Sequence, residues 1–156
     1  VLVDPAEERT VSGAAVTVAD AERSLAGLRV LAAEDNRTNQ IVLKHMLKKV
    51  GLTLEIVENG NAAVIAWQKA RYDMILMDIN MPVMDGLEAT RQIRAIESRN
   101  MLKTTPILAV SANAMVHQVA GYLSEGMSGH VAKPISRECL VQAMANALAA
   151  EGRWPD

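Results

Sequence analysis

Five short apolar segments, separated by stretches with a helical pattern, constrain the fold of this chain more than any other feature. The segments cover residues 28–33, 53–57, 74–78, 106–110 and 130–132. Between them, apolar residues recur at the three- and four-residue spacing of a helix. Because short buried strands that alternate with helices form parallel sheets with right-handed crossovers, the sequence predicts an α/β doubly wound domain.

This pattern occupies only part of the chain. Residues 1–26 show no sustained period, so they are predicted to be a linker or a tail from a preceding domain, with a strand near residues 11–18 as the alternative. The predicted domain covers residues 27–150, and residues 151–156 form a short tail. The chain begins with Val1, and we expect it to be processed or cut from a larger protein.

Composition excludes several classes of function. The net charge of -2, without a cluster of lysine and arginine, gives no basis for nucleic-acid binding. No apolar run approaches the roughly 20 residues that span a bilayer, so no direct membrane contact is expected. The single cysteine, Cys139, indicates a reducing compartment such as the cytoplasm. It lies within an apolar helical pattern and is predicted to be a small core residue.

Asp78 closes the apolar segment Met74–Asp78, and the chain turns directly afterwards at Pro82 and Asp85. A carboxylate at the end of a buried strand is costly unless it faces solvent or a bound ion. In open α/β sheets, ligands bind outside the carboxyl ends of the strands. Asp78 is therefore a candidate functional residue, and the alternative is that it merely caps the following turn.

The other strand ends strengthen the functional interpretation of Asp78. If the strands are parallel, their carboxyl ends share one edge, which would gather Glu34, Asp35, Asp78, Ser111 and Lys133. Three carboxylates repel one another, and an all-oxygen set of this kind suits Mg²⁺. A carboxylate beside Mg²⁺ can act as a nucleophile toward a phosphoryl group. A hydroxyl and a lysine are suited to bind the oxygens of that group.

The residues at the strand ends form four sequence motifs. They read Ala33-Glu34-Asp35-Asn36, Met77-Asp78-Ile79-Asn80-Met81-Pro82-Val83-Met84-Asp85-Gly86, Val110-Ser111-Ala112-Asn113-Ala114 and Val131-Ala132-Lys133-Pro134-Ile135. In this order they resemble the receiver domain of two-component response regulators, over roughly residues 28–149. The sequences of these motifs are most similar to those of receivers attached to hybrid sensor histidine kinases. The resemblance implies a flavodoxin-like five-stranded parallel sheet of order 2-1-3-4-5 with five helices.

The resemblance also implies a metal site. Asp35 and Asp78 would ligate Mg²⁺ directly, the backbone carbonyl of Asn80 would supply a further ligand, and Glu34 would act through water.

The remaining site residues would act on the phosphoryl group. By resemblance, Asp78 is the phosphoacceptor, Lys133 pairs with the phosphoryl group through a loop whose Lys133–Pro134 bond is cis, and Ser111 moves to bond it and triggers the switch. His130 stands where the family often has Phe or Tyr as a second switch residue. It is either a half-buried ring of adequate size or a source of pH-sensitive switching.

The function that these residues imply is phosphoryl transfer in signalling. A phosphohistidine on a kinase dimerisation domain would be the donor, and a histidine phosphotransfer domain would be the acceptor. Ile41 is expected to lie off the apolar face of its helix, where it could help to dock a partner helix.

Two alternatives remain at this stage. One is a Mg²⁺-dependent phosphatase of the haloacid dehalogenase type, which typically has a second Asp two residues after the nucleophile, whereas this chain has Asn80. The other is an interaction module that is never phosphorylated. The complete set of carboxylates, hydroxyl and lysine favours the phosphoacceptor, which is not an enzyme acting on outside substrates.

Overall fold

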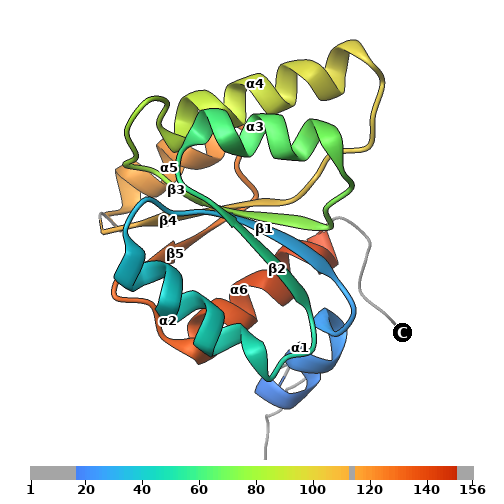
Figure 1. The fold of residues 1–156 in the computed structure, drawn as a ribbon, viewed down its shortest axis with the longest axis vertical. Helices are drawn as coiled ribbons and strands as arrows, with labels where there is room; N and C mark the ends of the chain where they lie inside the picture. Colours follow the sequence, from blue (N-terminus) through green and yellow to red (C-terminus); the bar gives the residue numbers. More distant parts are fainter. Residues whose placement is uncertain (1–16, 113–114, 151–156) are drawn as a thin grey trace, which may run out of the picture.

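The computed structural model describes residues 17–112 and 115–150 of the 156-residue chain. Its centre is a five-stranded parallel sheet of order β2-β1-β3-β4-β5 (Figure 1). The strands are β1 (Arg29–Ala33), β2 (Thr53–Val57), β3 (Met74–Asp78), β4 (Ile107–Ser111) and β5 (Gly129–Ala132). This order confirms the fold predicted from the sequence.

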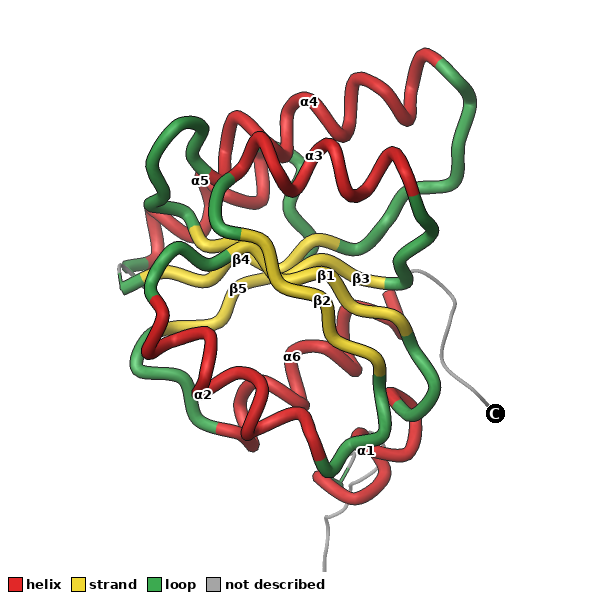
Figure 2. The backbone as a smooth tube through the Cα atoms, in the orientation of Figure 1, coloured by secondary structure: helices red, strands yellow, loops and turns green. Residues whose placement is uncertain are grey.

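Six helices surround the sheet within the described residues. They are α1 (Val18–Leu25), α2 (Arg37–Lys48), α3 (Gly60–Lys69), α4 (Gly86–Arg99), α5 (Val116–Ser124) and α6 (Arg137–Ala150). Helices α1, α2 and α6 cover one face of the sheet, and α3, α4 and α5 cover the other (Figure 2). The molecule therefore has three layers, with one apolar core on each side of the sheet.

Alternation along the strands assigns side chains to the two cores. Met74 and Leu76 pack toward α2 and α6, whereas Ile75 and Met77 pack toward α3, α4 and α5. Strand β3 is buried along its whole length, as expected for a central parallel strand.

Polar caps end the loops that follow three strands. Asn36, Asn59 and Asp85 precede α2, α3 and α4, and each side chain accepts a hydrogen bond from the backbone N–H three residues on. The caps fix where each helix begins, and so they fix the short loops at the carboxyl edge of the sheet.

Helix α1 differs from the sequence prediction. Residues 1–26 were assigned to a linker or tail, and five helices were expected, but Val18–Leu25 forms a sixth helix. Its N-cap is Thr17, and Ala21 and Leu25 are fully buried in the core beside α6. This helix has only two turns, too few for its period to stand out in the sequence. Residues 1–16 and 151–156 lie outside the described residues.

Two side chains lie elsewhere than the sequence patterns indicate. Glu97 is a charged residue of α4 and would ordinarily face solvent, yet it is buried because it accepts a hydrogen bond from the backbone N–H of Thr105 in the loop before β4. Cys139 was expected in the core, but it is exposed. It precedes the buried face of α6, which begins at Leu140.

Within residues 17–112 and 115–150, no helix combines the length and the apolar character needed to cross a membrane.

Candidate functional site

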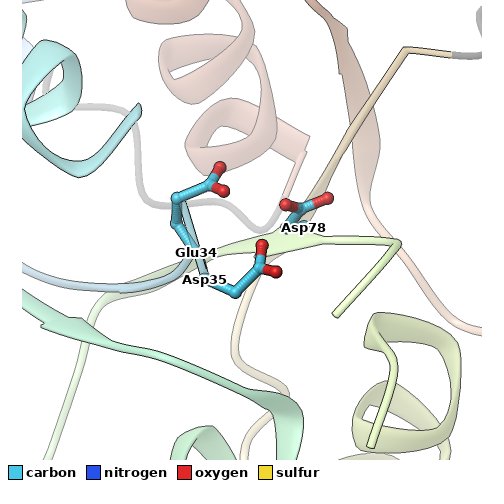
Figure 3. A group of neighbouring side chains, drawn as sticks. All are labelled: Glu34, Asp35 and Asp78. Atoms are coloured by element: carbon cyan, nitrogen blue, oxygen red, sulfur yellow. The ribbon is translucent and has the colours of Figure 1, made fainter. Parts of the chain in front are cut away.

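Three carboxylates converge at the carboxyl edge of the sheet (Figure 3). Glu34 and Asp35 follow β1, Asp78 ends β3, and one oxygen of each lies within 4.8 Å of the others. Glu34 and Asp78 are almost fully buried, whereas Asp35 is exposed. The structure therefore brings together the three acids that the sequence placed at neighbouring strand ends.

Lys133 supplies the positive charge that faces this cluster. Its Nζ donates a hydrogen bond to Asp78 Oδ2 at 3.0 Å and lies 3.4 Å from Glu34 Oε1. Burial by itself lowers the pKa of the Lys133 ammonium, but the hydrogen bond from Lys133 and the charges of Asp78 and Glu34 outweigh burial and raise that pKa. One ammonium thus contacts two of the three carboxylates, and the site keeps an excess of negative charge.

Glu34 is the acid that this excess affects most clearly. Burial raises the pKa of the Glu34 carboxyl, and the neighbouring Asp78 raises it further. The backbone N–H of Asn36, which donates to Glu34 Oε2 at 3.1 Å, and the ammonium of Lys133 act in the opposite direction. The carboxylate form of Glu34 is therefore only partly compensated by the protein.

Helix α2 holds Glu34 in place through two amides whose role the sequence did not reveal. Asn39 Nδ2 lies 3.4 Å from Glu34 Oε2, and Gln40 Nε2 donates to the backbone carbonyl of Glu34 at 2.7 Å. Both residues occupy the first turn of α2, directly beside the end of β1. Asn39 and Gln40 therefore hold the side chain and the backbone of Glu34 at the edge of the sheet.

The loop after β3 is held tightly against Asp78. The N–H of Asn80 donates to Asp78 Oδ1 at 3.2 Å, and the N–H of Gly86 donates to the carbonyl of Ile79 at 3.0 Å. A Cβ on Gly86 would lie 2.2 Å from the Asp78 carbonyl oxygen, so only glycine fits there. Val83 has a φ of 69°, which is unfavourable for a β-branched residue. This packing fixes the position of the Asp78 backbone.

Ser111 ends β4 at the same edge, but its side chain faces the other side of the sheet. Ser111 shares a face with Ala109 in the α5 core, whereas Asp78 shares a face with Leu76. Ser111 Oγ lies 3.1 Å from the hydroxyl of Tyr122, on α5, and both residues are buried. Tyr122 was not predicted from the sequence, because nothing in the local pattern links it to a strand end.

His130 lies in the same part of the molecule as Tyr122. The two rings are 5.7 Å apart between centroids, and burial lowers the pKa of His130. The ring is half-buried, as expected from the sequence. The Lys133–Pro134 peptide bond is cis, as the resemblance implied. The predicted site residues Glu34, Asp35, Asp78, Ser111 and Lys133 therefore lie at the carboxyl edge of the sheet. His130 lies further back along β5, opposite Ala109.

The donor set fits a hard divalent cation. Glu34, Asp35 and Asp78 offer three carboxylate oxygens within 4.8 Å of one another, and Mg²⁺ prefers oxygen ligands from one or two carboxylates together with water. The negative charge that Lys133 leaves uncompensated gives such a cation a physical role.

Known proteins show the same fold and sequence pattern. Residues 30–145 match the family model of the response regulator receiver domain. The sensor protein GacS of Pseudomonas syringae pv. syringae is 40% identical over 116 residues, which is 74% of this chain and 13% of GacS. Probable histidine kinase 1 of Oryza sativa subsp. indica is 34% identical over 146 residues, covering 73% of this chain and 15% of the kinase. The chain therefore spans only a small part of these relatives.

Two solved structures bear on the site. The receiver domain of the sensor histidine kinase PA1611 from Pseudomonas aeruginosa PAO1, with magnesium coordinated in its active-site cleft, is 38% identical with a TM-score of 0.67. The match covers 81% of this chain and 99% of that one. The receiver domain of Ssk1 from Saccharomyces cerevisiae, crystallised with the phosphotransfer protein Ypd1, is 28% identical with a TM-score of 0.72. It covers 80% of this chain and 94% of that one.

Fold, strand-end motifs and family match agree. The chain belongs to the response regulator receiver domain family of two-component and phosphorelay signalling. Its sequence resembles the receiver domains of hybrid sensor histidine kinases.

Proposed function

We propose that Asp78 accepts a phosphoryl group from a phosphohistidine. The observation that carries this proposal is the buried Asp78 carboxylate, which lies beside the Lys133 ammonium and two further acids at the carboxyl edge of the sheet. An oxygen of Asp78 attacks the phosphorus, the P–N bond of the phosphohistidine breaks, and the imidazole leaves with the bonding electron pair. The product is an acyl phosphate on Asp78.

The residues around Asp78 hold the reacting groups. Asp35, Asp78 and the Asn80 carbonyl would hold Mg²⁺ directly, and Glu34 would hold it through water. The bound ion would neutralise charge on the transferring phosphoryl group. Lys133, already hydrogen-bonded to Asp78, is positioned to pair with a phosphoryl oxygen. Ser111 would leave its position beside Tyr122 to bind another oxygen, and that movement would shift the switch region.

The partners follow from this chemistry. The donor is a phosphohistidine on a kinase dimerisation domain, and the acceptor is a histidine phosphotransfer domain. The similarity to GacS, and to a receiver crystallised with Ypd1, supports a hybrid histidine kinase as the parent protein. Ile41 on α2 is 62% exposed and supplies an apolar contact for a partner helix. The unpaired, exposed Cys139 supports a reducing compartment such as the cytoplasm.

A phosphorylation assay tests this function. The protein is incubated with Mg²⁺ and a small phosphodonor, and its intact mass is measured. A single phosphate adduct is expected for the wild type and should be lost in Asp78→Asn. Asp85→Asn is the matched control, because Asp85 is exposed, caps α4 and can be replaced by another good capping residue. Steady hydrolysis of added phosphoesters would instead support the phosphatase, and the absence of any adduct would support the interaction module.

A further inference from the structure

The strongest unassigned feature is the group formed by Ser111, Tyr122 and His130 on the α5 side of the sheet. Ser111 and Tyr122 are 1% and 7% exposed, and their hydroxyl oxygens are 3.1 Å apart. A hydrogen bond between two buried hydroxyls is costly to break unless each finds another partner. Ser111 therefore leaves this position at a cost that depends on what Tyr122 contacts next.

His130 carries a buried acceptor that lacks such a partner. Within the described residues, Nε2 of His130 is buried and makes no hydrogen bond. Buried polar atoms are nearly always paired, so an unpaired one calls for an explanation. Burial also lowers the pKa of His130, which keeps the imidazole neutral and leaves one ring nitrogen able to accept.

The three side chains lie on one face of the sheet and close together. His130 is the register partner of Ala109, which lies two residues before Ser111 on β4, so both side chains point toward α5. The Tyr122 and His130 rings are 5.7 Å apart with a tilt of 31°. The Tyr122 side chain thus contacts Ser111 through its hydroxyl and neighbours His130 through its ring.

We propose that Tyr122 is a positioning residue that exchanges hydrogen-bond partners during the switch. In the resting state its hydroxyl holds Ser111 on the α5 side, away from Asp78. When Ser111 turns toward a phosphoryl group on Asp78, the Tyr122 hydroxyl donates to Nε2 of His130, whose ring proton then resides on Nδ1. This exchange rests on the proposed function, because the phosphoryl group on Asp78 is what causes Ser111 to move. The exchange gives the His130 imidazole a role at a position where the family often has Phe or Tyr.

Nitrogen NMR of the three histidines tests the exchange directly. The protein is labelled with ¹⁵N-histidine and kept at a pH of about 8, above the ordinary pKa of imidazole. The His130 signals are assigned from the spectrum of His130→Phe. On phosphorylation with Mg²⁺ and a small phosphodonor, the Nε2 signal of wild-type His130 should move upfield, as an acceptor nitrogen does when it gains a hydrogen bond.

Two variants separate the exchange from a merely structural role. Ser111→Ala removes the Ser111 hydroxyl that Tyr122 contacts at rest, so we expect its unphosphorylated His130 signal to lie already at the upfield position. Tyr122→Phe keeps the ring but removes the hydroxyl, so the upfield shift should be lost in both states. Tyr72→Phe is the matched control, since it removes the only other tyrosine hydroxyl, which binds Glu55. It should leave the His130 shift unchanged.

The outcomes distinguish this inference from the proposed function. If the intact mass shows the phosphate adduct while the His130 signal stays fixed, the exchange is wrong and the phosphoacceptor role stands. If no adduct forms, the phosphoacceptor role is wrong, and unphosphorylated Ser111→Ala still tests the exchange. An unchanged His130 signal in Ser111→Ala, or an upfield shift that survives in Tyr122→Phe, would overturn the proposal.

Discussion

Glu34 and Glu97 are both only 2% exposed, but their surroundings are opposite. Glu97 receives a hydrogen bond from Arg94 at 2.8 Å and another from the backbone N–H of Thr105 at 2.7 Å. Glu34 shares a single ammonium with Asp78 and lies beside two other carboxylates. A buried acid that is fully paired is costly to replace because its partners are left buried and unpaired, whereas an acid left with excess like charge suits a cation site. Burial alone does not separate the two roles.

The largest effect on stability is expected from Glu97→Ala. This change leaves Arg94 without its ion-pair partner and the Thr105 N–H without its acceptor, which should cost about 3–5 kcal/mol. The free energy of unfolding in urea measures the loss. Glu125→Ala is the control, because Glu125 also pairs with an arginine of α4, but the Arg91–Glu125 side chains are 47% and 37% exposed. Equal losses in the two variants would contradict a special role for the buried pair.

For Glu34→Gln we expect the opposite result, a large effect on Mg²⁺ affinity and no loss of stability. The amide can still accept the hydrogen bond from Asn36, and the repulsion from Asp78 is removed, so stability without Mg²⁺ should not fall. Mg²⁺ affinity should fall about 10- to 100-fold, the usual cost of losing a group that acts on a metal through its outer shell. Calorimetric titration with Mg²⁺ measures it.

Glu58→Gln is the matched control for this titration, since Glu58 follows β2 at the same edge but is exposed. A Glu34→Gln protein with wild-type Mg²⁺ affinity would rule out the assignment of Glu34 to the metal site.

His130 adds a third kind of buried polar group, one without a hydrogen-bond partner in the described part of the chain. Burial lowers the pKa of His130 below the ordinary value of 6.5. At pH values between the pKa of the folded state and that of the unfolded state, the unfolded chain therefore binds more protons than the folded protein. Stability should therefore fall as pH is lowered below 6.5, and His130→Phe should remove that part of the decline. Urea unfolding at pH of about 8 and about 5.5 measures it.

A wild-type pH dependence in His130→Phe would contradict this account of the imidazole. The same two pH values test the pH-sensitive switching considered from the sequence. Identical phosphorylation-dependent NMR shifts in β5 and α6 at both values would exclude it.

The smallest effect concerns backbone conformation at the two edges of the sheet. Val83, beside the Asp78 loop, and Met101, after α4, have φ values of 69° and 55°. A left-handed conformation costs an L-residue roughly 1–2 kcal/mol, and glycine gives back roughly 0.5–1 kcal/mol through its more flexible unfolded chain. Val83→Gly should thus stabilise by less than about 1 kcal/mol, and Met101→Gly by less, because methionine is unbranched. Thermal unfolding measures both, and a larger gain at Met101 would contradict the dependence on branching.

The parts of the fold that the sequence predicted are those governed by local pattern. The strand ending at Asp78 is a run of four apolar residues that precede the acid, and parallel topology then places Glu34, Ser111 and Lys133 at one edge. Glu97 could not be predicted, because its partner at Thr105 is supplied by the tertiary fold. Tyr122 was missed for the same reason, since its contact with Ser111 joins α5 to β4 across eleven residues.

Helix α1 has a consequence for anyone who prepares this domain. Ala21 and Leu25 are fully buried, and Glu22 forms an ion pair with Arg137 at the start of α6. A truncation at residue 30, where the family match begins, would strip these residues and uncover the apolar strip of α6 that they shield. Such a fragment should self-associate as its concentration rises, because association would bury the exposed apolar strip again. Expression boundaries for this protein are therefore better set ahead of Thr17 than at the limits of the family.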